Sequence, residues 1–510
     1  MLVAVYSSSV FGVDANLITL EVNIGQGIGY HLVGLPDNAI KESNYRIMAA
    51  LTNLGYKIPG KKITINMAPA DMRKEGAAYD LPLALGILAA SGQIQADSLQ
   101  KYIVLGELAL DGTIRPIKGA LPIALQALRD GFTGFILPKE NAEEAAIVKS
   151  LEVYGVSHLT EVIAFFEQKE KPAPTKVDVR KEFEAQLNAF AFDFSDVKGQ
   201  ETIKRGMEIA AAGGHNILLI GPPGAGKTML AKRLPSILPP LRLEEALETT
   251  KIHSVVGKVK TRGLIHQRPF RSPHHTISDV ALVGGGSYPQ PGEISLAHNG
   301  VLFLDELPEF KRSVLEVLRQ PLEDREITIS RARFTVTYPA SFMLVASMNP
   351  SPSGQFYDPN SKSGPTAFER QRYLNKLSGP LLDRIDLHIE VEPVPFAQLS
   401  EERLAESSAA IRQRVTAARA LQTKRFQDLP LHYYAQMTTR HLRTFCVLDA
   451  SSKDLLKKAM ERLSLSARAY DRIIKVSRTL ADLEAVEHIQ AAHIAEAIQY
   501  RSLDREGWLG

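Results

Sequence analysis

A glycine-rich loop is the first stretch of this sequence whose residue types and spacing could do chemistry. Residues 221–228 read GPPGAGKT, the complete pattern G-x-x-x-x-G-K-[ST], and they lie between the apolar run 216–220 and a helix-compatible stretch. In such a loop, glycines let backbone N–H groups turn toward phosphate oxygens, and the following helix adds the positive end of its dipole. Lys227 would hold the β- and γ-phosphates, and Thr228 would ligate a magnesium ion, whereas a chance glycine-rich turn is the weaker alternative. The predicted nucleotide-binding residues are Gly221, Pro222, Pro223, Gly224, Ala225, Gly226, Lys227 and Thr228.

Two acidic residues follow a second apolar strand, which is predicted over residues 301–304. Asp305 would hold the magnesium ion through water at the carboxyl end of this strand, and Glu306 would polarise the attacking water as general base. Alone, an apolar run that ends in two acids is commonly a solvated strand end. Downstream of a complete phosphate loop, the pair predicts that the chain binds and hydrolyses ATP, with Mg²⁺ as cofactor.

Two more polar residues are candidates for a role in nucleotide hydrolysis. Asn349 follows the apolar strand predicted over 342–347, and it could orient the lytic water or simply cap a turn before proline. Arg384 lies among apolar residues in LLDRIDL. It could pair with Asp383 or Asp386, or it could be a finger that reaches the γ-phosphate of a neighbouring subunit.

A predicted C-terminal helix begins with a further cation. Arg468 lies near the start of this helix, and we expect it to touch nucleotide. Arg472, Lys475 and Arg478 follow at helical spacing, so the four cations share one face. For the last three, a solvated face is the expected explanation.

The elements that must position these residues form three parts and one linker. Residues 1–167 mix short strands with helices and suggest an α+β or α/β unit, and residues 168–190 are polar with prolines, as linkers are. Residues 191–395 alternate strand and helix in an α/β pattern, and residues 396–510 are almost wholly helical. The predicted strands of the first part are 17–22, 62–67, 102–105 and 134–137, its predicted helices are 38–54 and 81–90, and the predicted C-terminal helices are 405–424, 438–445, 452–463, 466–483 and 489–501.

Length and composition indicate several cores in one soluble chain. At roughly 150 residues per domain, the 510 residues predict about three domains. Apolar residues make up 45% and charged residues 23%, which excludes disorder as the dominant state, and a net charge of +3 identifies no partner. The single cysteine, Cys446, excludes a disulfide framework and a multi-cysteine metal site. The first residues do not form a secretory signal and the longest apolar run, 81–90, is too short to cross a bilayer, so we expect a cytoplasmic protein without a membrane partner.

The ordered motifs resemble those of the AAA+ ATPases, and more narrowly those of the magnesium-chelatase-like branch and its ComM/YifB family. The more specific pieces are RPFRSPHHT from Arg268, GEISLAHNG from Gly292, SGPLLDRIDL from Ser378 and EAIQYR from Glu496. The resemblance covers nearly the whole chain. It implies a Lon-protease-like N-terminal domain, an AAA+ three-layer α/β/α core and a helical lid, assembled into a hexameric ring.

The same resemblance implies roles for three residues. It makes Asn349 the first sensor, Arg384 the finger that acts on a neighbouring subunit, and Arg468 the second sensor. The best-understood family members act in natural transformation as ring-shaped DNA helicases that drive branch migration. The resemblance therefore implies a homo-oligomeric motor that uses ATP and Mg²⁺ on DNA, with recombination or transformation proteins as possible partners.

Two N-terminal segments, RKEGAAYD and GELALDGTIRPI, are similar to those beside the catalytic serine and lysine of Lon proteases. Aligned on these neighbours, the serine position is Ala78 and the lysine position is Leu121. Neither side chain can attack a carbonyl or accept a proton, so the Ser–Lys mechanism is excluded. Lys74 and Lys118 are then expected to be surface lysines, and the domain to serve assembly or substrate docking.

A loop after Asn349 departs from the family pattern. Many family members carry cysteines there, as NPCPCG and a later pair, at the spacing of a zinc site. This chain has serines at those positions, and hydroxyls are poor zinc ligands, so no metal is expected in the loop. Asp358 and the prolines are the alternative means of holding it. The substituting serines are Ser351, Ser353, Ser361 and Ser363.

A basic stretch, residues 251–278, contains six Lys or Arg and four His but no Asp or Glu. Such a stretch suits a loop that follows a phosphate backbone without reading bases, so binding should be salt-sensitive. A strand-like segment, 325–338, could form a hairpin beside it. The alternative is that these cations meet acidic faces of neighbouring subunits or the nucleotide, and a metal pair at His274 and His275 is disfavoured because adjacent side chains diverge. The DNA-binding candidates are Lys258, Lys260, Arg262, Arg268, Arg271, Arg331 and Arg333.

Three functions remain open at this point. The leading hypothesis is a ring-shaped ATPase that acts on DNA, helicase-like, without nuclease or protease activity. The second is a motor subunit like that of a metal chelatase, and the third is an ATP-gated assembly that remodels proteins. Stimulation of ATP hydrolysis by DNA would separate the first from the other two.

Overall fold

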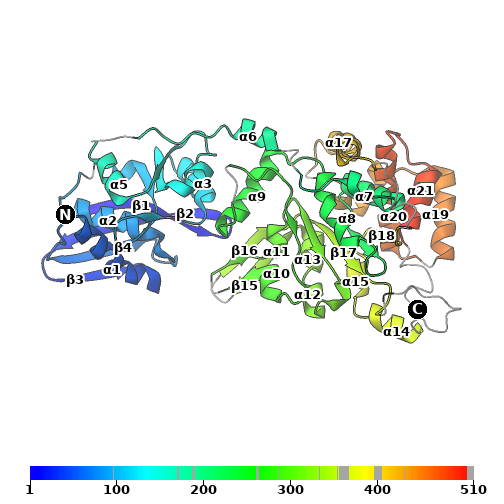
Figure 1. Ribbon diagram of the computed structural model, residues 1–510, viewed down its shortest axis with the longest axis horizontal. Coiled ribbons are helices and arrows are strands. Elements are labelled where there is room, and N and C mark those ends of the chain that lie inside the picture. Colours follow the sequence, from blue (N-terminus) through cyan, green and yellow to red (C-terminus); the bar gives the residue numbers. More distant parts are fainter. Residues whose placement is uncertain are drawn as a thin grey trace. The chain divides into compact units, whose positions relative to one another are not determined.

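The chain folds into two compact units, Met1–Gln186 with Leu243–His266 and Leu187–Arg242 with Gln267–Gly510. We call them the N-terminal unit and the C-terminal unit; Figure 1 shows most of the first in blue and cyan and the second in green to red. The computed structural model describes residues 1–510 except 96, 169–171, 187–189, 260–262, 287, 332–333, 353, 355–366, 396–404, 430, 464 and 502–510.

The N-terminal unit is built on a mixed sheet whose described strands lie in the order β3-β4-β2-β1-β5-β8-β9. β1 and β2 form a long antiparallel hairpin, β4 continues it, and the pairs β1–β5, β5–β8 and β8–β9 are parallel. Helix α2 packs on β1 and β2 and is buried along its whole length, because nearly all of its residues are apolar. The strands are β1 (Leu2–Phe11), β2 (Asp14–Gly25), β3 (Gly29–Val33), β4 (Lys62–Ala68), β5 (Tyr102–Val104), β8 (Gly134–Pro138) and β9 (Glu152–Val156), and the helices include α1 (Asn38–Asn53), α2 (Asp80–Ala90), α3 (Ala120–Arg129), α4 (Lys139–Ala145) and α5 (Leu159–Phe166).

The elements predicted for residues 1–167 are all present. The four predicted strands correspond to β2, β4, β5 and β8, and the two predicted helices to α1 and α2. β1, β3 and β9 were not among the predicted strands, and helix α6 (Val179–Gln186) lies within the predicted linker.

Helix α9 (Leu243–Val255) belongs to the N-terminal unit although the sequence pattern placed residues 191–395 in one domain. Ser254 carries this attachment: its hydroxyl donates to Glu144 Oε1 at 2.5 Å, and its carbonyl oxygen accepts from Gly119 N–H at 3.0 Å. Lys251 forms an ion pair with Asp14 at 2.9 Å. The first part of the basic stretch therefore packs within the N-terminal unit and is no free loop.

The C-terminal unit contains a parallel sheet whose described strands lie in the order β11-β14-β17-β10-β18. The three central strands, β14, β17 and β10, are buried along their whole length and almost entirely apolar, as expected for a parallel sheet that is covered on both faces. The carboxyl ends of β14, β17 and β10 are neighbours, so the residues that follow these strands meet at one edge. The strands are β10 (Ile217–Ile220), β11 (Phe270–Arg271), β14 (Val301–Leu304), β17 (Met343–Met348) and β18 (Leu387–Glu390), and the helices beside them include α7 (Glu201–Gly213) and α8 (Lys227–Arg233).

The predicted C-terminal helices are present, with ends shifted by a few residues. Helix α7 packs on β18 and also on α17 and α20, so it joins the sheet to the helical part of the unit. Ser466 starts α20 by accepting the Ala469 N–H at 3.2 Å. The helices are α17 (Ser408–Arg425), α18 (Thr439–Phe445), α19 (Ala450–Arg462), α20 (Ala467–Leu483) and α21 (Ala491–Gln499).

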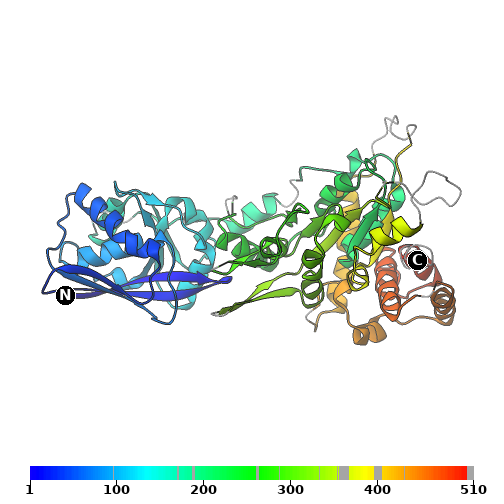
Figure 2. The ribbon, with the colours of Figure 1, turned by 90° about the horizontal axis from the view of Figure 1, so that it is seen from below.

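An antiparallel hairpin, β15 (Glu326–Arg331) with β16 (Phe334–Pro339), forms its own small sheet and confirms the predicted hairpin over 325–338 (Figures 1 and 2). Ile327 and Ile329 are buried, and the exposed face carries three threonines and one serine. No helix in the described part of the chain is long and apolar enough to cross a membrane.

Candidate active site

The glycine-rich loop connects β10 to α8, as its sequence predicts. Gly224 and Gly226 have φ values of 80° and 89°, the left-handed region that glycine adopts without a Cβ clash. Lys227 is the first residue of α8, and its Nζ donates to Gly221 O at 2.6 Å, Pro222 O at 2.9 Å and Asn349 Oδ1 at 3.1 Å. Burial lowers the pKa of Lys227, and Asp305 and Glu306 oppose that shift. The ammonium group thus lies inside the loop, where it can exchange carbonyl oxygens for phosphate oxygens.

The two predicted magnesium ligands meet beside this loop. Thr228 Oγ1 donates to Asp305 Oδ2 at 2.7 Å. A hydroxyl and a carboxylate are the oxygen donors that Mg²⁺ prefers, so this pair fits the ion. The other carboxylate oxygen of Asp305 accepts from the hydroxyl of Ser347. Sequence reasoning missed Ser347, although a hydroxyl residue in an otherwise apolar strand is a usable signal.

Glu306 has an unusual backbone for a residue with a side chain. Its φ is 53°, in the left-handed region, which costs about 1 kcal/mol and is common at functional sites. Its N–H faces Ser347 Oγ at 3.4 Å, and its carboxylate lies 3.8 Å from His275 Nδ1. The side chain is 59% exposed, so a water molecule can reach it, as a general base requires.

Asn349 follows β17 and lies between Lys227 and a cavity of about 460 Å³. Glu306 lines the same cavity, so the predicted base and the predicted sensor share it. Helix α14 (Ala367–Leu374) supplies Arg372 and Tyr373, which sequence reasoning did not single out. Burial raises the pKa of Tyr373 to about 12.

Gln200 is a second residue that sequence reasoning missed. It has a φ of 59°, and its amide donates to Ala225 O in the loop at 3.0 Å and to Glu392 O beyond β18 at 3.3 Å. It therefore holds the loop against the neighbouring strand. No spacing rule identifies such a residue, because its partners are distant in the sequence.

Arg384 lies outside the Lys227–Thr228–Asp305 cluster. Its guanidinium is 8% exposed and forms an ion pair with Glu323 of helix α13 (Arg319–Asp324). It also donates to Pro380 O. The sequence offered Asp383 or Asp386 as partners, and both of these are wrong: the partner comes from a different helix.

Arg468 also lies outside the cluster. Its side chain is 60% exposed and pairs with Asp383 at 2.8 Å. The prediction of a solvated face for the next cations on α20 is wrong, because Lys475 and Arg478 are buried and Arg472 pairs with buried Asp386 at 2.8 Å. Helical spacing shows which charges share one face of the helix, but it does not identify the acidic partners that come from other elements.

The basic candidates behave differently from one another. Arg268 donates to Pro239 O at 2.7 Å and Asn299 O at 2.8 Å, and Arg271 forms a two-point pair with Glu293 at 2.5 and 2.7 Å. These two cations are thus engaged within their own unit. Lys258 and Arg331 are exposed, and Lys260, Arg262 and Arg333 lie outside the described residues. Of the substituted loop, Ser351 is buried, and Ser353, Asp358, Ser361 and Ser363 also lie outside them.

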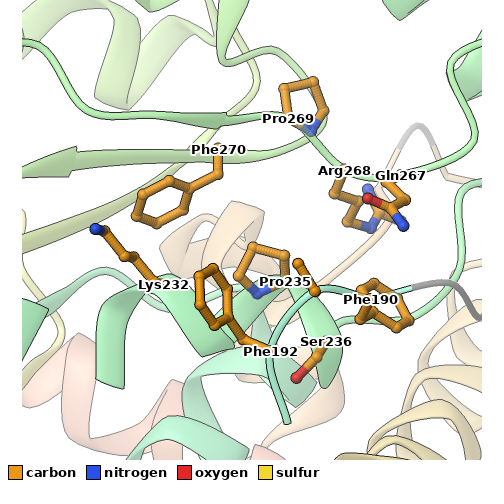
Figure 3. Close-up of a pocket in the computed structure, with 10 residues that line it drawn as sticks. Phe190, Phe192, Lys232, Pro235, Ser236, Gln267, Arg268, Pro269 and Phe270 are labelled. Carbon is orange, nitrogen blue, oxygen red and sulfur yellow. The ribbon is translucent and has the colours of Figure 1, made fainter. Parts of the chain in front are cut away.

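A second cavity, of about 440 Å³, lies at the far end of α8 from the phosphate loop. Figure 3 shows the rings of Phe192 and Phe270 on two sides of it, with Lys232 nearby and Phe190 beside Gln267. The rings of Phe190 and Phe192 are faced by the guanidinium groups of Arg412 and Arg233 at 4.8 and 5.5 Å. This cavity is therefore separate from the phosphate-binding cluster.

The positions aligned with a Ser–Lys dyad hold no reactive group. Ala78 carries no nucleophile, and Leu121 is fully buried in the core of its unit. Lys74 is also fully buried, and its Nζ donates to Gly34 O at 3.0 Å and to Pro69 O. The prediction that Lys74 is a surface lysine is therefore wrong, whereas Lys118 is exposed as predicted.

Three family descriptions of the ChlI subunit of magnesium chelatase match the chain. "Subunit ChlI of Mg-chelatase" matches residues 20–141, "Magnesium chelatase, subunit ChlI" matches 193–399, and "Magnesium chelatase, subunit ChlI C-terminal" matches 405–501.

Several relatives cover almost the full length, among them YifB and ComM. The chain is 47% identical to "Uncharacterized protein YifB" of Escherichia coli K12 over 506 residues, 98% of this chain and 97% of that protein. It is 45% identical to "Competence protein ComM" of Haemophilus influenzae over 507 residues, 99% and 98% of the two chains. It is also 28% identical to "Lon protease 2" of Bacillus subtilis over 158 residues, 28% of this chain and 27% of that one.

Proposed function

The chain belongs to the ComM/YifB family of magnesium-chelatase-like AAA+ ATPases, and we propose that it is a ring-shaped motor that hydrolyses ATP between protomers and moves along DNA. One observation carries the ATPase part of this proposal. Residues that follow three different strands, Lys227, Asp305 and Asn349, are brought together by their side chains around one phosphate-binding loop. We further propose a homo-oligomer, a hexamer as the resemblance implies, that works in recombination or transformation.

The residues around the loop divide the chemistry between them. Lys227 would release its carbonyl partners and hold the β- and γ-phosphates. Thr228 and Asp305 would hold Mg²⁺, which supplies charge neutralisation on the phosphates when bound. Glu306 would take a proton from the attacking water, and Asn349 would orient that water with its amide.

Arg384 would act on the nucleotide of a neighbouring protomer. Among the described residues, its guanidinium contacts Glu323 and Pro380 O, and neither belongs to the phosphate-binding loop. A guanidinium beside the γ-phosphate stabilises the charge of the transition state and contributes about 10³–10⁵ in rate where such fingers occur. This role requires assembly, because one protomer supplies the loop and the next supplies the cation.

The DNA part of the proposal depends on the remaining exposed cations and on the relatives. Arg331 lies at the tip end of the β15–β16 hairpin, and the outer face of that hairpin is polar. Lysines and arginines that contact only phosphates bind without base preference and lose affinity as salt rises. The relative ComM is named a competence protein, and this name agrees with a role in DNA uptake or recombination.

Branch migration on a synthetic three-strand junction tests this proposal directly. The wild-type chain should convert the junction only with ATP and Mg²⁺, and DNA should raise its rate of ATP hydrolysis. Glu306→Gln should bind the junction and ATP but leave the junction unconverted. ATP hydrolysis that does not respond to any DNA would reject the DNA motor.

The matches to the ChlI subunit favour one alternative, a motor that serves a metal chelatase. Such a motor needs separate subunits that bind the metal acceptor, and its ATPase responds to them and not to DNA. A protein-remodelling assembly would likewise respond to unfolded protein. Comparing the three stimulants in one ATPase assay separates these functions.

A further inference from the structure

Helix α20 holds the segment that carries Arg384 at two points. Arg468 pairs with Asp383 at 2.8 Å, and Arg472, one helical turn later, pairs with Asp386 at 2.8 Å. The two acidic residues flank Arg384 in the sequence. Two cations of α20 therefore form ion pairs with the residues on both sides of Arg384.

The two ion pairs differ in burial. Arg468 is 60% and Asp383 32% exposed, so water and salt weaken this pair and it can exchange partners readily. Asp386 is fully buried and Arg472 is 20% exposed. An unpaired charge at a buried site is strongly disfavoured, so breaking the Arg472–Asp386 pair costs more than breaking the Arg468–Asp383 pair.

Asp386 also ties the segment to the sheet through Asn216, the residue before β10. Its Oδ2 accepts the Asn216 N–H at 3.0 Å, and its own N–H donates to Asn216 O at 3.0 Å. The Asn216 side chain donates to Arg384 O at 2.9 Å and accepts from Leu344 N–H of β17 at 2.8 Å. Arg384 is thus connected through defined hydrogen bonds to the residue before β10, the strand that precedes the phosphate loop, and to β17, the strand that Asn349 follows.

The electrostatics of Asp386 agree with a permanent pair. Burial alone would raise its pKa, but Arg472 and the neighbouring His215 hold the pKa below its ordinary value. Asp386 is therefore a buried carboxylate whose charge is compensated by Arg472.

We propose that Arg472 and Asp386 are positioning residues that fix the Arg384 segment to α20, so that the position of the helical lid sets where Arg384 is presented to the neighbouring protomer. This inference rests on the proposed action of Arg384 on that neighbour. It gives each protomer a physical link from its own lid to the next ATP site. Neither residue touches the nucleotide in this scheme, because the Lys227 cluster is complete without them.

The test uses Arg472→Gln and the double variant Arg472→Gln/Asp386→Asn, which leaves no unpaired buried charge. The matched control is Arg425→Gln. Arg425 is 22% exposed and pairs with buried Asp482 at 2.8 Å, but this pair joins α17 to α20 and does not touch the Arg384 segment. Each full-length variant is assayed for ATP affinity, for kcat, and for recovery of kcat when Glu306→Gln subunits are added.

We expect the Arg472 variants to keep wild-type ATP affinity and to lose about 10–100-fold in kcat, the size of effect that a misplaced catalytic group produces. Glu306→Gln subunits carry an intact Arg384 segment, so adding them should restore part of the rate. Arg425→Gln should keep a kcat within about twofold of wild type, since its pair is remote from Arg384.

Two results separate the possible failures. Suppose that adding Glu306→Gln subunits restores the kcat of Arg384→Ala. The positioning role is then wrong if the Arg472→Gln/Asp386→Asn variant keeps wild-type kcat, or if it loses kcat and the added subunits do not restore it. If the added subunits do not restore the kcat of Arg384→Ala, Arg384 does not act on the neighbouring protomer, and the positioning role is rejected together with that action.

Discussion

The guanidinium of Arg384 is paired within its own chain with the carboxylate of Glu323. The arginine is 8% exposed, whereas the glutamate is 55% exposed, so the pair closes over the arginine from the solvent side. An arginine that must reach a neighbouring protomer has to leave this partner first. The pair therefore sets a cost on presenting Arg384 between protomers.

Glu323→Gln should make Arg384 easier to present. A pair with a half-exposed partner contributes at most about 1 kcal/mol, so we expect a two- to fivefold rise in ATP hydrolysis and unchanged ATP affinity. Steady-state ATPase measured against protein concentration checks this, with Glu326→Gln, an exposed carboxylate on β15, as control. A loss of activity in Glu323→Gln would instead make Glu323 a residue that orients the finger.

Lys227→Ala should weaken nucleotide binding strongly. The ammonium is the one side-chain cation that hydrogen-bonds within the described part of the loop, and charged hydrogen bonds contribute about 1.5–3 kcal/mol each. ATP affinity should fall at least tenfold, as measured by titration calorimetry. Lys232→Ala, on the same helix but exposed, should bind ATP like the wild type.

Glu306→Gln should separate binding from turnover. The substitution keeps the size of the side chain but removes the base, which contributes about 10²–10⁴ in rate for general-base catalysis. ATP affinity should stay within about twofold, and the assembled ring should persist in ATP because hydrolysis no longer releases it. Unchanged turnover would show that Glu306 is not the base.

The sequence predicts which residues meet at the glycine-rich loop because of a simple property of parallel strands. Lys227, Asp305 and Asn349 each follow an apolar run, and the carboxyl ends of neighbouring parallel strands share one edge. Chemistry that is encoded at strand ends can therefore be found without knowing the strand order. The β15–β16 hairpin was predicted on a different basis, the strand-like pattern of residues 325–338.

The sequence could not predict the partners that come from distant elements. Arg384 pairs with Glu323, Arg271 with Glu293 and Arg472 with Asp386, and each partner comes from a separate element. Spacing within one helix gave the wrong environment for Lys475 for the same reason. The attachment of α9 to the N-terminal unit also depends on long-range packing, for which no local motif exists.

Ser347→Ala should lower the rate of hydrolysis without abolishing ATP binding. The Ser347 hydroxyl donates to Asp305 and lies 3.4 Å from the Glu306 N–H, so it supports the magnesium ligand and the base together. A hydrogen bond to a charged group contributes about 1.5–3 kcal/mol, which corresponds to a fall in kcat of about tenfold or more. Ser236→Ala removes an equally buried hydroxyl away from the site and should leave kcat unchanged. Equal losses in both variants would assign Ser347 a purely structural role.

Lys475 provides a pH-dependent test of the packing around α20. Burial lowers its pKa from 10.5 to about 8, and its described hydrogen-bond partner is Ala435 O at 3.1 Å. The folded state therefore penalises the charged lysine at neutral pH. Since the unfolded chain binds more protons between about pH 8 and 10.5, this group makes the fold more stable as pH rises through that window.

Lys475→Met should remove that penalty. A pKa shift of this size corresponds to a destabilisation of about 3 kcal/mol, which the substitution removes. The substitution also loses one hydrogen bond, which costs about 1 kcal/mol, so the variant should be more stable than the wild type by about 2 kcal/mol at pH 7. The difference in unfolding free energy should shrink toward pH 10, where the wild-type lysine is neutral. Chemical denaturation at pH 7, 8.5 and 10 measures it, with Lys458→Met, an exposed lysine of α19, as the control without pH dependence in this range. A stability difference that stays constant from pH 7 to 10 would mean that water reaches the Lys475 ammonium and that α20 is packed more loosely than the burial of Lys475 indicates.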